Sequence, residues 1–334
     1  MKSAPIKVQL TPQRRPVTDV VGLELGAGFA EGVPAVRLRK REGKTELVSV
    51  GFLRLPGTLP EAAGAAEGAP AAWQLPRPFQ APHAALAVTS KLAYLRNATG
   101  VGDEVPEKGQ ADFRTVSRSS APDLPALAAG LPEFQAAWAA RLLPEGRRPT
   151  ACSLQVSAAA AMNCFTAGPA FSASAGTAVA LFVFAEHTAL TAFHDSRLVL
   201  YREHPVGYTH LRLAVSTQMR IEPALADAVL DDTLIDPTPM IEPVLRPLFR
   251  QVEISSDYLQ RRRNCQSKNF FICGLPAGVN FWSSVFFSMM NLPLTSISPF
   301  DGIEKPARNH TDPGAAAPYL MAAVGAARAV LEDV

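Results

Sequence analysis

The stretch TAVALFVFAEHTALTAFHDSRLVLYREHPVG, residues 177–207, is the part of the chain that decides the fold. Residues 179–184 form an almost unbroken apolar run, typical of a strand buried on both faces of a sheet. The polar residues Glu186-His187-Thr188 interrupt this run, and a second apolar run follows. His194-Asp195-Ser196 predicts a tight turn, and residues 198–201 a returning strand. The stretch therefore predicts strand, polar tip, strand, turn and strand within one sheet.

The same layout occurs once earlier in the chain. Residues 19–25 (DVVGLEL) predict a strand, Gly26-Ala27-Gly28 a turn, residues 33–39 the returning strand and residues 45–52 a third strand. Two such hairpin units, far apart in the sequence, indicate a duplicated fold. This organisation resembles the actin-like ATPases, with hexokinase and the heat-shock chaperone ATPases. In those proteins two hairpins face each other across a cleft and hold the nucleotide phosphates with backbone N–H groups.

Composition sets outer limits on the function. A chain of 334 residues with 48% hydrophobic residues predicts two domains or two lobes with a sizeable core. The net charge of +2 argues neither for nor against a polyanionic partner. Scattered histidines and the absence of a CxxC pair argue against a zinc site. No secretory signal opens the sequence and no apolar run reaches the roughly 20 residues of a bilayer span, so we expect a cytoplasmic protein. The four cysteines are expected to be buried, apolar and reduced; they are Cys152, Cys164, Cys265 and Cys273.

Three helices matter for the later comparison. Apolar residues at helical spacing within residues 124–143 predict a helix in this stretch, and Pro132 fits the first turn of a helix. A long helix is expected from about residue 239 to residue 264, kinked or restarted at Pro247. An alanine-rich terminal helix is expected over residues 318–331. The expected organisation is a flexible tail (1–18), a first lobe (19–168) with an inserted subdomain (about 77–150), and a second lobe (169–334) with a small subdomain (about 208–265).

With these elements placed, the chain resembles the PilM family, the actin-like proteins of bacterial type IV pilus assembly. FtsA and the type II secretion protein GspL are more distant relatives. The resemblance implies an α/β, actin-like (ribonuclease H-like) two-lobed duplicated fold with a small inserted α+β subdomain in the first lobe. Its motifs occur in family order; they are VVGLELG (20–26), VALFVF and HDSRLVLYREHPVG (within 179–207), IEPALADAV (221–229), ICGLPAG (272–278), NLPLTSISPFDGIE (291–304) and AVGAARA (323–329).

The resemblance also implies where a nucleotide would bind. Actin-like ATP sites need a carboxylate at each hairpin tip to hold Mg²⁺ through water, and glycines that let the backbone approach phosphate. At the first tip the chain has Glu24 in place of Asp, followed by Gly26 and Gly28. At the second tip only Thr188 survives, and at the adenosine turn only Gly274. ATP and Mg²⁺ are therefore expected only if this degenerate cleft still works.

Two interpretations of these five residues stay open. The glycines are ordinary turn residues and the protein is a pseudo-ATPase, which the loss of motifs favours. Alternatively, Glu24, Thr188 and Gly274 still hold nucleotide weakly. Glu186 would repel phosphate at the second tip, and Glu186 or His187 could serve as a catalytic base only if phosphate were bound.

The PilM resemblance implies a scaffold that binds the cytoplasmic N-terminal peptide of a PilN-like single-span membrane protein, with no nucleic acid and with membrane contact only through this partner. The expected groove lies in the first lobe and takes an extended apolar peptide. The alternatives are an active ATPase or sugar kinase of the same fold, and an FtsA-like filament former. Homo-oligomerisation and the choice between a pilus and a secretion system stay open. The residues expected to contact the peptide are Ala87, Leu92, Tyr94, Trp138 and Leu154.

Overall fold

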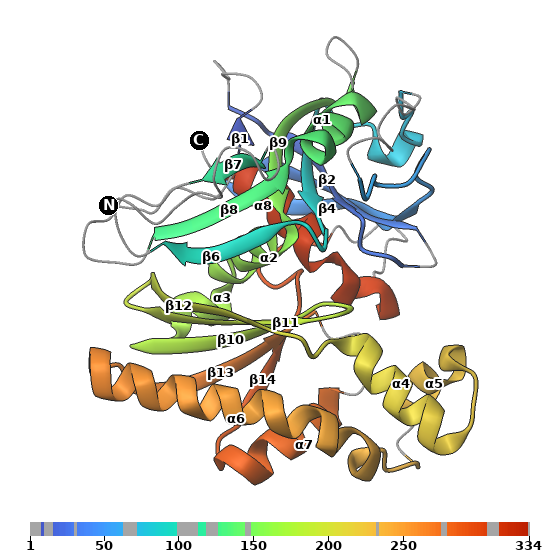
Figure 1. The fold of residues 1–334 in the computed structure, drawn as a ribbon. Coiled ribbons are helices and arrows are strands. Elements are labelled where there is room, and N and C mark those ends of the chain that lie inside the picture. The colour runs from blue at the N-terminus through green and yellow to red at the C-terminus, as the bar shows by residue number, and fades with distance from the viewer. Residues whose placement is uncertain are drawn as a thin grey trace. The chain divides into compact units, whose positions relative to one another are not determined.

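The chain folds into two compact units, which are described separately below (Figure 1). Unit 1 comprises residues 1–169 and 299–334, and unit 2 comprises residues 170–298. The structure is a computed structural model. It describes residues 8–9, 16–29, 32–62, 72–98, 113–117, 126–143, 148–231, 234–274, 279–305 and 314–332.

Unit 1 is built on a six-stranded sheet. β2 and β3 pair antiparallel, as do β3 and β4, whereas β5 and then β9 continue the other side of β2 in parallel. The three strands expected between residues 19 and 52 are confirmed. In sheet order the strands are β1 (Val8–Gln9), β9 (Thr150–Val156), β5 (His83–Val88), β2 (Asp19–Leu25), β3 (Val33–Arg41) and β4 (Lys44–Leu53).

Unit 2 repeats this arrangement with five strands. Its first two strand pairs are antiparallel and its last two are parallel, in the same order as in unit 1. The duplication expected from the sequence is therefore present in the topology. In sheet order the strands are β12 (Arg197–His204), β11 (Thr188–His194), β10 (Thr177–Val183), β13 (Ser267–Cys273) and β14 (Leu294–Ile297).

Two helices, α2 (Ser157–Thr166) and α8 (Met321–Leu331), pack together on the unit 1 sheet. Two glycines permit the close approach. A Cβ on Gly22 of β2 would lie 2.0 Å from the Ala323 carbonyl oxygen, and a Cβ on Gly325 of α8 would lie 1.8 Å from the Ala160 carbonyl oxygen. Neither position can carry a larger residue unless the helix moves. Gly325 therefore lets α8 pack directly against the backbone of α2.

This packing corrects one expected boundary. Residues 299–334 were assigned to the second lobe, but they belong to unit 1. The Glu304 N–H donates to the Thr45 carbonyl, and the Leu47 N–H donates to the Glu304 carbonyl, each at a distance of 2.9 Å. The 3-10 turn η3 (Gly314–Leu320) then leads into α8. Sequence order suggested the wrong unit, because the position of a helix in the sequence does not show against which sheet it packs.

Arg328 of α8 is a buried charge that ties three parts of unit 1 together. Its Nε lies 3.2 Å from a carboxylate oxygen of Glu332, and its guanidinium donates to the Asp301 carbonyl at 3.3 Å. It also donates to the Ala167 carbonyl just after α2. Because a buried guanidinium is stable only when its donors are satisfied, these contacts hold the end of α2, the turn before residue 305 and α8 together.

The part of unit 1 inserted between β5 and β9 corrects a second expectation. Residues 124–143 do not form one helix: residues 126–132 are a strand, and the helix begins at Glu133. This strand is the centre of a three-stranded sheet, and its Gly130 packs onto Tyr94, where a Cβ would lie 2.3 Å from a ring carbon. Tertiary pairing overrides the weak helical preference of an Ala-Leu-Gly segment. The elements are β6 (Tyr94–Ala98), β8 (Ala126–Pro132), β7 (Phe113–Ser117) and α1 (Glu133–Leu142).

Helices cover the unit 2 sheet, and the core lies between the sheet and α6 and α7 (Figure 1). Phe249 contacts both Trp282 and Phe286, with ring centroids 5.8 and 5.2 Å apart. The long helix runs without restart through Pro243 and Pro247, because one face of it is buried along most of its length. The helices are α3 (Pro169–Ala173), α4 (Tyr208–Met219), α5 (Pro223–Asp231), α6 (Thr238–Arg263) and α7 (Val279–Met290).

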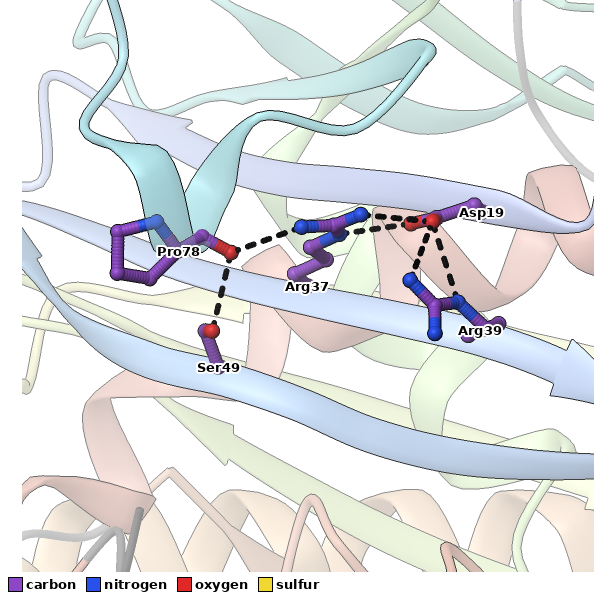
Figure 2. A network of polar contacts seen from close by, with 5 residues as sticks. All are labelled: Asp19, Arg37, Arg39, Ser49 and Pro78. Atoms are coloured by element: carbon purple, nitrogen blue, oxygen red, sulfur yellow. Dashed lines mark hydrogen bonds and ion pairs between the residues drawn. The ribbon is translucent and has the colours of Figure 1, made fainter. Parts of the chain in front are cut away.

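Figure 2 shows a charged network on the unit 1 sheet. Arg37 holds both carboxylate oxygens of Asp19 at 2.8 Å, and Arg39 contacts the same carboxylate. The Pro78 carbonyl accepts from Arg37 at 3.2 Å and from the Ser49 hydroxyl at 3.0 Å. The network therefore fixes the turn η2 (Arg77–Phe79), which leads into β5, against β3 and β4.

Candidate functional site

The first hairpin tip carries a buried carboxylate. Glu24 lies near the end of β2, Thr89 follows β5, and Ser157 begins α2 directly after β9. Because these three strands are parallel neighbours, their carboxyl ends bring the three side chains together. Thr89 Oγ1 lies 2.7 Å from Glu24 Oε1 and 2.8 Å from Ser157 Oγ.

Burial raises the pKa of Glu24 from its ordinary value of 4.5 to about 7, although the hydrogen bonds from Thr89 and Ser157 act in the opposite direction. Only 5% of the residue is exposed. A carboxylate that is to hold hydrated Mg²⁺ must be ionised and open to water. Glu24 is instead enclosed within unit 1 and bonded to its own neighbours, so it is poorly suited to that role.

The two glycines of this tip differ. Both have positive φ, +77° at Gly26 and +74° at Gly28, so both sit where glycine is favoured. A Cβ on Gly26 would lie 2.3 Å from the Thr89 carbonyl oxygen and 2.9 Å from a methyl carbon of Leu59, whereas no heavy atom lies within 4 Å of a Cβ on Gly28. Gly26 is therefore packed inside unit 1, and only Gly28 keeps open space beside it.

The loop that contains Leu59 connects the first tip with helix α1 of the inserted part: it contacts the tip at Gly26 and α1 at Gln135 and Trp138. The buried Gln135 side chain of α1 donates to the Pro60 carbonyl at 2.8 Å. Trp138, one turn further along α1, lies 3.8 Å from the position of a Cβ on Gly57. The first tip is thus in contact with a loop that α1 holds in place.

The second tip, between β10 and β11, is closed on itself. Thr188 is fully buried, and its hydroxyl donates to the Val206 carbonyl at 2.6 Å. The hydroxyl that the sequence suggested for nucleotide binding is therefore committed to the protein's own backbone. Gly274, with φ of +79°, follows β13, which is parallel to β10, and so lies at the same edge of the sheet as Thr188.

The start of α4 completes this closure. The first helical N–H groups, at Tyr208 and Thr209, donate to the carbonyls of Phe184 and Ala185 at 2.9 Å each. Free N–H groups at a helix N-terminus are a common binding site for phosphate. Here the carbonyls of the tip accept from these N–H groups in the position where a phosphate would otherwise bind. Gly207 makes this approach possible, since a Cβ there would lie 2.4 Å from the Ala185 oxygen and from the His187 nitrogen.

Glu186 and His187, the two residues considered as bases, each contact a neighbouring residue at the second tip. A carboxylate oxygen of Glu186 lies 3.1 Å from the Thr209 hydroxyl. The His187 ring stacks on Phe184 with centroids 4.8 Å apart. Burial lowers the pKa of His187, although the Glu203 and Glu186 carboxylates act in the opposite direction. His187 therefore contributes to the tip's packing, whereas Glu186 is exposed and is joined to the tip only through Thr209.

The structure separates the residues expected to contact a peptide. Ala87, Trp138 and Leu154 are at most 3% exposed and belong to the core of unit 1, so their side chains cannot line a surface groove. Tyr94 is partly exposed and packs against Gly130. Leu92 is 42% exposed and is the member of the set most available to a partner. The sequence did not show that both faces of β9, which carries Leu154, are covered.

Sequence reasoning missed four residues that shape the two tips: Thr89, Ser157, Leu59 and Gly207. Only Gly207 carried a local signal, since it directly precedes a helix. The other three act through contacts between segments that are distant in the sequence.

Two searches of the described ranges found nothing. No three His, Cys, Asp or Glu side chains there are grouped so that they could hold a metal ion. No helix among the same residues has the length and apolar character needed to span a bilayer. None of the four cysteines forms a disulfide bond, and all four are buried, as expected from the sequence.

Comparison with known proteins relates this geometry to solved structures. No protein-family model matches the chain. No curated protein matches it either. A chain of the PilM-PilN type IV pilus biogenesis complex superposes with a TM-score of 0.67 and 14% identity, covering 95% of this chain and 99% of that one.

Two further solved structures are less similar. The ethanolamine utilization protein EutJ from Carboxydothermus hydrogenoformans matches with a TM-score of 0.46 and 14% identity over 96% of this chain and 92% of its own. Ta0583, an archaeal actin homolog in complex with ADP, matches with a TM-score of 0.46 and 14% identity over 94% and 99%. The fold assignment rests on the first match and on the duplicated strand order: the chain has the actin-like α/β fold of two related lobes.

Proposed function

We propose that this chain is a PilM-like scaffold of a type IV pilus, or related type II secretion, assembly platform, and that it is a pseudo-ATPase. The observation that carries the second part is the closed tip of unit 2. Thr188 donates to Val206, and the Phe184 and Ala185 carbonyls cap α4. The groups that would bind phosphate in a working site are thus already bonded within the protein.

The state of Glu24 supports the same proposal from unit 1. A carboxyl group with a pKa near 7, bonded to Thr89 and enclosed, is a weak ligand for hydrated Mg²⁺. At both hairpin tips the groups named above therefore already have hydrogen-bond partners within the protein. Fold alone does not supply the chemistry of an ATPase.

The first part of the proposal is supported by the match to a chain of the PilM-PilN complex over nearly the whole length of both chains. By this analogy, the partner is a PilN-like membrane protein whose cytoplasmic N-terminal peptide binds unit 1. The chain would then be cytoplasmic and would reach the inner membrane through that partner. The exposed Leu92, next to β6, is the expected side-chain contact.

Two measurements test the proposal. Titration with ATP and Mg²⁺ to millimolar concentration should leave the melting temperature unchanged. A ligand raises the melting temperature only when it binds the folded state, and we expect no such binding here. A clear rise in melting temperature would instead favour an active ATPase or kinase. A synthetic peptide with the cytoplasmic N-terminal sequence of a PilN-like protein should bind the purified protein, and Leu92→Asp should weaken that binding, with Leu234→Asp, another exposed leucine, as the control. Failure of the peptide to bind would remove the PilN-like partner.

A further inference from the structure

The edge of the unit 1 sheet at β9 is occupied by a segment of the same chain. Val8 pairs with Leu154 and Gln9 with Ser153, antiparallel, while β5 takes the other side of β9 in parallel. β9 is therefore an interior strand only because two residues from the beginning of the sequence lie along it. Figure 1 shows β1 next to β9, and β7 and β8 of the inserted sheet also contact β9.

The side chains of β9 are buried and therefore are not available to a partner. Residues 151–156 are all buried, and Ser153 and Gln155 are fully so. The Gln155 amide donates to Ser153 Oγ at 3.0 Å, and the Asn163 amide of α2 donates to Gln155 Oε1 at 3.0 Å. A segment that joins this edge is therefore recognised through its backbone, by N–H and C=O groups in a strand ladder.

The occupying strand is short. Two paired residues make a ladder well below the usual five or six residues of a strand, and each backbone hydrogen bond contributes only modestly to stability. The sequence around it, Ile6-Lys7-Val8-Gln9-Leu10, alternates apolar and polar residues, which is the pattern of a strand with one face towards protein.

We propose that the outer edge of β9 is a strand-addition surface for an extended peptide of alternating apolar and polar residues, and that Val8–Gln9 occupies it as an intramolecular competitor. The proposal deepens the proposed function, on which its partner rests: the peptide of the membrane partner displaces β1. Because the competitor is tethered, its effective concentration is on the order of millimolar, and it raises the apparent dissociation constant of any peptide in solution.

The test uses full-length chains and a labelled peptide of residues 4–13, APIKVQLTPQ. One variant, Val8→Pro/Gln9→Pro, removes both backbone N–H groups of β1, and the matched control Val8→Ala/Gln9→Ala keeps them. We expect the proline variant to bind the peptide at least about tenfold more tightly than the wild type, and the alanine variant to resemble the wild type. Hydrogen exchange at the β9 amides that face β1 should speed up in the proline variant and slow again when peptide is added. Of the neighbouring Ser153 and Leu154 amides only one faces β1, because successive N–H groups of a strand point to opposite sides. Equal affinity for all three chains, absence of binding to all of them, or unchanged exchange at the amides that face β1 would overturn the proposal.

The same chains separate this proposal from the proposed function. If the PilN-like peptide binds all three chains equally, the partner stands and the competition by β1 fails. If the peptide of residues 4–13 binds the proline variant as expected but the PilN-like peptide does not, the strand-addition surface stands and the proposed partner fails.

Discussion

Thr89 Oγ1 lies 2.7 Å from Glu24 Oε1, inside unit 1 and at the carboxyl ends of two parallel strands. This contact links the carboxylate of the first hairpin tip to the protein's own core. Its consequences can be measured without any ligand, because burial shifts the pKa of Glu24 to about 7.

Glu24 should make unit 1 less stable as the pH rises. Its pKa is 4.5 in the unfolded chain and about 7 when folded, so between these values the folded state holds more protons. Its stabilising contribution is therefore complete below pH 4.5 and is lost as the pH rises through 7, by at most about 3 kcal/mol. Glu24→Gln should remove this loss, so that the variant exceeds the wild type in stability at pH 8 and not at pH 5. Urea denaturation followed by circular dichroism measures it, and a variant that is less stable at both pH values would contradict the expectation.

Asp19, on the same strand, should show the opposite dependence. Burial alone would raise its pKa, but the hydrogen bonds and charges of Arg37 and Arg39 outweigh burial and hold the pKa below its ordinary value (Figure 2). Its contribution is present above the unfolded pKa and is lost as the pH falls through the folded one. Asp19→Asn should therefore cost stability at pH 7 and much less at pH 3. An equal loss at both pH values in the same urea experiment would show that packing, not charge, is responsible.

Gly26 and Gly28 form a matched pair at the first tip. Replacing either with alanine imposes the cost of a positive φ, about 1 kcal/mol. Only at Gly26 does the new Cβ also meet the Thr89 carbonyl, so Gly26→Ala should destabilise unit 1 by at least about 2 kcal/mol more than Gly28→Ala. Thermal denaturation of both variants compares them directly. Equal losses would mean that the Thr89 backbone moves aside.

Thr188→Val tests whether the second tip is structural. The substitution keeps the shape of the side chain and removes the hydroxyl, which leaves the Val206 carbonyl without its donor. We expect a loss of about 1–3 kcal/mol in the stability of unit 2 and no change in the response to ATP and Mg²⁺. Trp282 fluorescence reports this unit once Trp73 and Trp138, which lie in unit 1, are replaced with Phe, and Thr217→Val on the exposed side of α4 is the control. If the variant lost a stabilisation by ATP that the wild type shows, Thr188 would be a nucleotide ligand.

The sequence by itself determined the elements that depend on local pattern. Both hairpin units appeared as apolar runs separated by turn residues, because a strand buried on both faces must be apolar throughout. Their repetition predicted the duplicated fold, and the loss of glycines at residues 183–187 predicted a second tip unsuited to phosphate.

Only the tertiary structure decided what depends on contacts between distant segments. Residues 126–132 read as helix from their alanines and leucines, yet they form a central strand because β6 and β7 pair with them on both sides. The assignment of α8 to unit 1 required the approach of Ala323 to Gly22, and the closure of the second tip required Val206 to reach Thr188. Hydrogen bonds and close packing between residues far apart in the chain leave no periodic trace in the sequence, so they become visible only when the chain is folded.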